Sequence, residues 1–97
     1  MSFENHLKEE MRLVILRLLN DLPSYRGNSS TLHGGLNHWG LGFSRDQVKT
    51  ELHWLREQGC LNIEFDNPDV IVVKLTERGQ DVVEGRTKVH GIKRPSA

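Results

Sequence analysis

Apolar residues at the start of the chain recur at the spacing of an α-helix. From the third residue onward they are separated by four, four, three and four positions: Phe3, Leu7, Met11, Val14 and Leu18. This spacing predicts a long amphipathic helix that ends near Leu22-Pro23. Four more apolar residues widen the stripe beyond one face: Leu13, Ile15, Leu16 and Leu19. Since a helix that is apolar on several faces needs several packing partners, we expect it to form a homodimer interface; the alternative is the central core helix of a monomer.

A second, shorter helix is predicted after a polar loop. Residues 23–30 are polar and contain turn formers, and Ser29 or Ser30 offers a cap for the helix that follows. The apolar residues of this helix lie at spacings of four and three: Leu32, Leu36 and Trp39. We assign them to its buried face. Gly34 and Gly35 each weaken an isolated helix by about 1 kcal/mol relative to Ala, so they indicate the close approach of another helix or of a DNA backbone.

The stretch from Ser44 to Leu61 combines a helix start, one apolar stripe and a helix stop. Ser44 supplies a capping hydroxyl, and Asp46 places a carboxylate at the positive end of the helix dipole. The stripe again follows at spacings of four and three: Val48, Leu52 and Leu55. Gly59 suits the left-handed conformation that ends a helix. A short glycine-containing turn precedes this helix, so the second and third helices are predicted to form a helix-turn-helix.

After Gly59 the pattern changes from helical to alternating. The apolar side of the alternation predicts a half-buried strand: Leu61, Ile63 and Phe65. Residues 67–69 are turn formers, and Val70 to Leu75 predicts a second strand that pairs with the first as a hairpin. Thr76 then caps a short last helix. From Thr87 onward no apolar period remains.

These elements predict an α+β, mainly α fold of the winged helix-turn-helix type. It has three helices, a two-stranded β-hairpin wing and a short C-terminal helix. A length of 97 residues fits one such domain, which we assign to residues 1–86. Residues 87–97 are predicted to be a mobile basic C-terminal tail, because the chain from Arg78 onward carries five Lys or Arg residues against two acidic residues.

Two groups of residues carry a resemblance to winged helix-turn-helix regulators of the MarR, ArsR and PadR kind. The first group lies in the third helix: Ser44-Arg45, Gln47-Val48, Leu52, Leu55, Gly59 and Leu61. The second group is similar to the LTxxG segment of those regulators: Val73-Lys74-Leu75-Thr76-Glu77-Arg78-Gly79. The stretch SRDQVKTELHWLREQG also resembles small regulators of this fold in Mu-like prophages. The resemblance covers the chain from about Met11 to Val83.

The resemblance implies a transcriptional regulator that binds double-stranded DNA as a homodimer, with its two third helices in successive major grooves. Carried over residue by residue, the DNA-facing positions are Ser44, Arg45, Gln47, Lys49, Thr50 and His53. Arg45 and Lys49 suit phosphate or guanine, and Gln47 suits adenine. Ser44 and Thr50 suit phosphates near the helix N-terminus.

The zero net charge and the acidic wing motivate an alternative function. The formal net charge is zero, and the stretch from Ser44 to Gly59 balances three basic against three acidic residues. The predicted tip of the wing carries Asp66 and Asp69 where basic winged-helix proteins carry Arg or Lys, and like charge beside phosphate is unfavourable. The alternative is therefore a protein-interaction module that uses the winged-helix frame without binding DNA, for example in phage assembly or as an adaptor.

Other chemistry finds little support in the sequence. His33 and His38 are five residues apart, which does not place two metal ligands on one helical face, and the single Cys excludes an internal disulfide and a cysteine-rich zinc site. The chain contains no nucleophile elbow and no phosphate-binding glycine loop, so we expect no enzyme activity, no catalytic or metal-binding residues, no cofactor and no small-molecule ligand. An acidic, polar start and short apolar runs predict a cytoplasmic protein without a membrane partner.

Overall fold

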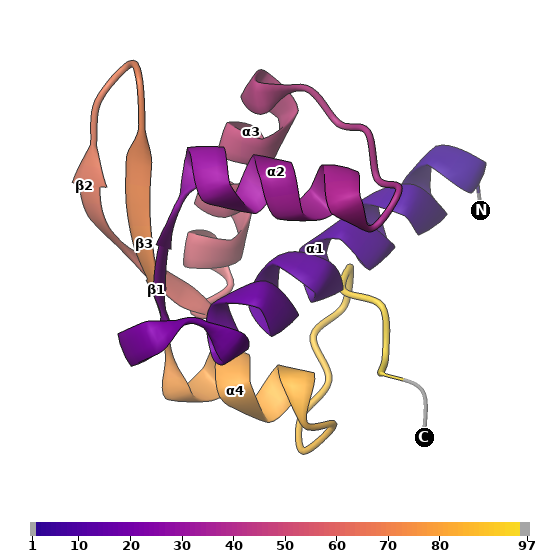
Figure 1. The fold of residues 1–97 in the computed structure, drawn as a ribbon. Helices are drawn as coiled ribbons and strands as arrows, with labels where there is room; N and C mark the ends of the chain where they lie inside the picture. The colour runs from indigo at the N-terminus through magenta and orange to yellow at the C-terminus, as the bar shows by residue number, and fades with distance from the viewer. Residues whose placement is uncertain (1, 96–97) are drawn as a thin grey trace.

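The computed structural model describes residues 2–95, which form an α+β, mainly helical domain (Figure 1). In chain order, its elements are α1 (Phe3–Asp21), the 3₁₀ turn η1 (Pro23–Tyr25), β1 (Arg26–Asn28), α2 (Ser29–His38), α3 (Arg45–Glu57), β2 (Leu61–Asp66), β3 (Ile71–Leu75) and α4 (Glu77–Val83). The helices predicted at the start of the chain, after the polar loop, after Ser44 and after Thr76 are all present.

The three strands form one antiparallel sheet in the order β1-β3-β2. The β2–β3 hairpin matches the prediction, and its tip extends beyond the helices (Figure 1). The sequence predicts a two-stranded wing, however, and places β1 in a loop. Strand β1 is short and polar, and it forms because it pairs with β3 while passing close to α1: a Cβ on Gly27 would lie 3.2 Å from Leu19 Cδ2.

Helix α1 lies at the centre of the molecule and contacts α2, α4 and β3. The residues that widen its apolar stripe are almost completely buried within the chain: Leu13 (2% exposed), Ile15 (0%), Leu16 (0%) and Leu19 (0%). The close approach indicated by the glycines of α2 occurs at Gly35, where a Cβ would lie 2.8 Å from Leu18 Cδ1 on α1. The domain itself therefore covers most of the stripe.

Three aromatic residues assigned to apolar faces are exposed, which corrects the sequence prediction. Phe3 is 75% exposed at the first residue of α1, and Trp39 is 66% exposed where α2 has already ended. Phe65 is 52% exposed because a β-bulge between Ile63 and Phe65 interrupts the alternation of β2. A bulge of one residue turns the following side chains away from the face that the alternation assigns to them.

The cap predicted for α2 is also corrected. Asn28, not a serine, accepts the bond from Thr31 N–H at 2.8 Å. Ser29 is buried, and its hydroxyl oxygen accepts a hydrogen bond from Ile71 N–H at 3.1 Å, which joins the start of α2 to β3.

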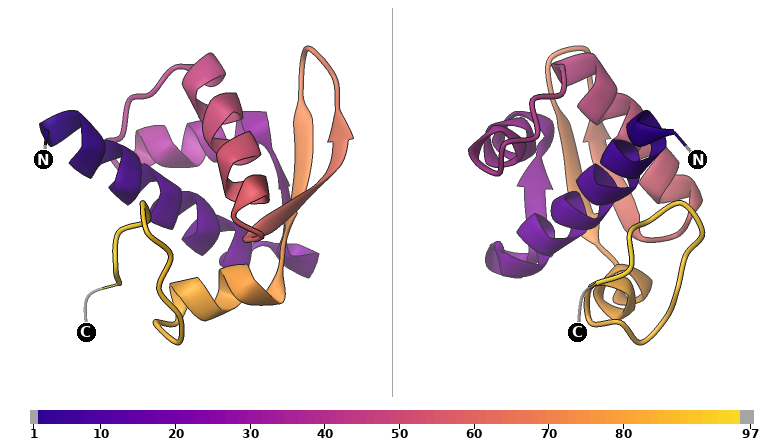
Figure 2. Two further views of the ribbon diagram at one scale, coloured as in Figure 1. Left: turned by 180° about the vertical axis from the view of Figure 1, so that it is seen from behind. Right: turned by 90° about the vertical axis from the view of Figure 1, so that its right-hand side faces the viewer.

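The C-terminal segment, residues 87–95, differs from the predicted mobile tail. It returns beside α1 (Figure 2), with Val89 and Ile92 buried in the core. Lys93 N–H donates to Glu9 O at 3.1 Å, and Arg12 Nη1 donates to Gly91 O at 2.8 Å. Two buried apolar residues, three positions apart, anchor this segment, although it shows no extended apolar periodicity. Residues 96–97 of the predicted tail lie outside the described residues.

Candidate nucleic-acid interface

Helices α2 and α3 are joined by a compact turn that fixes their relative position. Gly40 has a φ of +79°, and Gly40 N–H and Leu41 N–H donate to Asn37 O and Leu36 O at the end of α2. This pattern is a Schellman motif. Leu41 is buried, and His33 Nε2 lies 2.9 Å from Phe43 O, so the turn is held to both the core and α2.

The start of α3 carries a capping box. Ser44 Oγ accepts a hydrogen bond from Gln47 N–H at 3.1 Å, and Gln47 Oε1 accepts one from Ser44 N–H at 2.8 Å. The capping role predicted for Ser44 is confirmed, but Gln47, predicted to read a base, turns back onto its own helix. The S-x-x-Q pattern at residues 44–47 is the sequence signature of this motif and could have indicated it.

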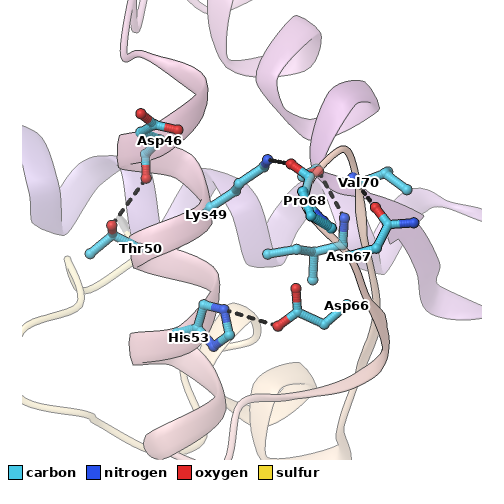
Figure 3. A network of polar contacts seen from close by, with 10 residues as sticks. Asp46, Lys49, Thr50, His53, Asp66, Asn67, Pro68 and Val70 are labelled. Carbon is cyan, nitrogen blue, oxygen red and sulfur yellow. Dashed lines mark hydrogen bonds and ion pairs between the residues drawn. The ribbon is translucent and has the colours of Figure 1, made fainter.

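The buried face of α3 follows the predicted stripe. Val48, Leu52 and Leu55 are each 0% exposed. Gly59, with a φ of +78°, ends the helix as predicted, because only glycine adopts this conformation without strain. On the exposed side of α3, the Lys49 and His53 side chains point towards the β2–β3 hairpin, which is the predicted wing (Figure 3).

Three more of the predicted DNA-facing side chains form contacts within the protein (Figure 3). Lys49 Nζ donates to Pro68 O in the wing turn at 2.6 Å, and His53 Nε2 lies 3.4 Å from Asp66 Oδ2. Thr50 Oγ1 donates to Asp46 O one turn earlier at 3.0 Å. Lys49 and His53 therefore hold the wing against α3.

The wing turn is itself well ordered by hydrogen bonds. Asn67 Oδ1 accepts from Asp69 N–H at 2.9 Å and from Val70 N–H at 2.8 Å, and Asn67 N–H donates to Val70 O at 3.1 Å. These contacts explain why an Asn-Pro-Asp turn closes the hairpin. They also fix the backbone that carries Asp66 and Asp69 beside α3.

Arg45 differs from the other candidates. Among residues 2–95, its exposed side chain has no hydrogen-bond or ion-pair partner. It shares a small recess with Lys49, with Ser29 and Ser30 at the start of α2, and with Asp69 of the wing. The structure thus brings two cationic side chains of α3, the N-terminus of α2 and the wing tip to one surface.

Sequence reasoning missed a polar cluster on the other side of α3. Arg12 Nε donates to Glu51 Oε1 at 2.6 Å, with the two side chains 14% and 7% exposed. The Arg12 guanidinium also lies 3.8 Å from the centre of the Trp54 ring and reaches Gly91 O. Trp54 therefore packs against α1, the helix that carries Arg12. In the sequence, the position of Glu51 between Val48 and Leu52 of the apolar stripe was the signal that its carboxylate is buried.

The pKa values of side chains are shifted in two places in the structure. Burial raises the pKa of the Cys60 thiol, although Arg78 offsets part of the rise. At the sheet, the hydrogen bond from the Arg26 guanidinium lowers the pKa of the Glu64 carboxyl below its ordinary value and raises that of Arg26.

The described residues also bear on metal binding and on membrane insertion. Within residues 2–95, His, Cys, Asp and Glu side chains do not gather in groups of three or more that would suit a metal ion. In the same part of the chain, every helix is too short or too polar to cross a bilayer.

The fold and this surface define a small α+β domain in which a capped helix faces a β-hairpin. The chain is 46% identical over 89 residues to "Uncharacterized protein gp26" of Escherichia phage Mu, covering 92% of this chain and 91% of that protein. It is 41% identical over 78 residues to an uncharacterized protein of Haemophilus influenzae, covering 80% of this chain and 76% of that protein. The chain therefore belongs to the family of the phage Mu protein gp26. No family model matches the chain, and no solved structure matches it.

Proposed function

We propose that the protein is a transcriptional regulator with a winged helix-turn-helix fold that binds double-stranded DNA as a homodimer through α3. The observation that carries the proposal is the single surface formed by the N-terminal half of α3, the start of α2 and the wing tip. A capped helix paired with a second helix through a fixed turn is the frame that presents side chains to a major groove.

On this surface the candidate residues have different roles. Arg45 is available to bind a phosphate or a guanine edge without giving up a contact within the described residues. Lys49 has to exchange the Pro68 carbonyl for a phosphate, which is a charge-assisted and stronger acceptor. Gln47 and Ser44 position the helix through the capping box, and the N-terminus of α3 offers N–H groups to a phosphate.

The proposal is tested by measuring DNA affinity at several salt concentrations on fragments of the source genome. Replacing both Arg45 and Lys49 with Ala should weaken binding and reduce the slope of log K against log[salt] by up to about two units, since each phosphate that a cation neutralises adds about 0.9 to the slope. Lys8→Ala, an exposed substitution on α1, is the control and should leave the slope unchanged. Folded protein that is not retained on DNA at low salt, or that binds independently of salt, would exclude the function.

A second candidate function is a protein-interaction module. It is favoured by the exposed Phe65 on the same hairpin as Asp66 and Asp69, an aromatic and acidic combination that suits a basic protein partner better than phosphate. The discriminating experiment compares Asp66→Lys/Asp69→Lys with Arg45→Ala/Lys49→Ala. Loss of a discrete protein partner only in the wing variant, together with no DNA binding by the wild type, would establish this function instead.

A further inference from the structure

A groove of about 380 Å³ lies along α1, on a surface that the proposed DNA contacts do not use. Its apolar lining comes from Val14 and Leu18 of α1, Val83 of α4 and Trp39 at the end of α2. Figure 1 shows α1 running between the C-terminal end of α2 and α4. The groove is therefore formed by three elements that are far apart in the sequence.

Trp39 is the most unusual feature of this groove. Its side chain is 66% exposed at the edge of an apolar depression. Large exposed aromatic residues beside a pocket are enriched at protein interfaces, where burial of one ring contributes much of the binding energy. This placement indicates an interaction surface.

The charges along the groove indicate what covers it. Glu10, Arg17 and Asp21 line it from α1, and their spacings of seven and four place them on one face of the helix. Among residues 2–95, none of the three has an ion-pair partner. Two copies of this face, placed antiparallel, bring Glu10 of each copy opposite Arg17 of the other, and the twofold axis then passes beside Val14.

We propose that a second copy of the chain occupies this groove, with the two α1 helices antiparallel, two reciprocal Glu10–Arg17 ion pairs and Trp39 covered by the other copy. This contact gives the homodimer of the proposed function a particular surface and register, but it rests on the groove and its charges and not on DNA binding. A surface that pairs with itself is the usual form of a twofold interface.

The register is tested with two charge reversals, Glu10→Arg and Arg17→Glu. In either variant alone, both reciprocal pairs become like-charged, and we expect self-association to weaken by about tenfold or more. In an equimolar mixture, the heterodimer again has two opposite-charge pairs, so native mass spectrometry should detect mainly the mixed dimer. Lys8→Glu, on the opposite side of α1, is the matched control and should dimerise like the wild type.

Trp39→Ala tests the apolar part of the contact. Because Trp39 is mostly exposed, the variant should remain folded by circular dichroism while its dimer dissociates about thirtyfold more readily in sedimentation experiments. A wild-type protein that stays monomeric at all concentrations overturns the inference, including a monomer with a small molecule in the groove. A dimer that these substitutions do not weaken also overturns the inference. So does an equimolar mixture of the two charge-reversed variants that does not form the mixed dimer.

The two proposals fail separately. A dimer that does not bind DNA removes the regulatory function and leaves this interface in place. A monomer that binds DNA with the expected salt dependence removes this interface and leaves DNA binding through α3 in place.

Discussion

The acidic residues of the wing provide the sharpest test of how DNA would approach α3. Asp66 lies 3.4 Å from His53, and Asp69 shares a recess with Arg45 and Lys49. A phosphate bound by Arg45 or Lys49 would therefore lie near both carboxylates. We predict that the double substitution Asp66→Asn/Asp69→Asn strengthens DNA binding.

The expected size follows from the electrostatic energy. Two like charges about 8 Å apart in water repel by roughly 0.5 kcal/mol, because the energy is about 332/(εr) with ε near 80. Removing both carboxylates should then stabilise the complex by about 1 kcal/mol, or roughly fivefold in affinity, at low ionic strength. Since the Debye length is about 8 Å at physiological ionic strength, the gain should fall to about twofold there.

Fluorescence anisotropy on a labelled duplex at low and at physiological salt measures this gain. The control is Glu4→Gln/Glu77→Gln, which changes the net charge equally but acts in the first turns of α1 and α4. An equal gain in the control would mean that only net charge matters. No gain in either variant, with DNA binding present in the wild type, would place the wing away from the DNA and refute the arrangement proposed for this surface.

Three further predictions concern the framework behind this surface. Glu51→Ala leaves the Arg12 guanidinium buried without its carboxylate and should lower the free energy of unfolding by about 3–5 kcal/mol in urea titrations; a decrease below about 1 kcal/mol would show that the pair is unimportant. Gly79→Ala should destabilise by about 1–3 kcal/mol, since its Cβ would lie 2.2 Å from Cys60 O, and an unchanged melting temperature would contradict this packing. Because burial raises the pKa of the Cys60 thiol and so reduces its thiolate fraction, a thiol reagent at neutral pH should label the folded protein far more slowly than the urea-unfolded chain; equal rates would show that the thiol is accessible.

The helices and the hairpin could be predicted because their determinants are local. The stripe of α3, the hydroxyl of Ser44 and the glycine at position 59 act within one helix, and each is found in the predicted role. The resemblance at the exit from the wing also has a local explanation. Gly79 lies against the Cys60 carbonyl, and Thr76 caps α4, so the segment fixes how α4 leaves the sheet.

The features that were missed depend on pairing and packing partners, most of which are distant in the sequence. Strand β1 exists only through its pairing with β3, and the bulge that exposes Phe65 is a property of the paired strands. Residues 87–95 are held by α1, more than seventy positions away, through Arg12 and Glu9. No short window of sequence contains both partners of the contacts that hold β1 or residues 87–95. The bulge lies within one hairpin, where Phe65 pairs with Val72, but it depends on the register of the pairing.

The candidate DNA-binding residues show why a donor-rich helix face is not equivalent to a set of available donors. By helix position alone, Gln47, Lys49 and Arg45 are equivalent candidates for DNA contacts. In the structure, however, Gln47 is hydrogen-bonded in the capping box and Lys49 is hydrogen-bonded to the wing turn. A base or phosphate has to compete with those contacts, whereas at Arg45 it competes only with water among the described residues. If the surface binds DNA, Arg45 should therefore contribute most to affinity, while Lys49 should link affinity to the position of the wing, because its ammonium group reaches a phosphate only after leaving Pro68.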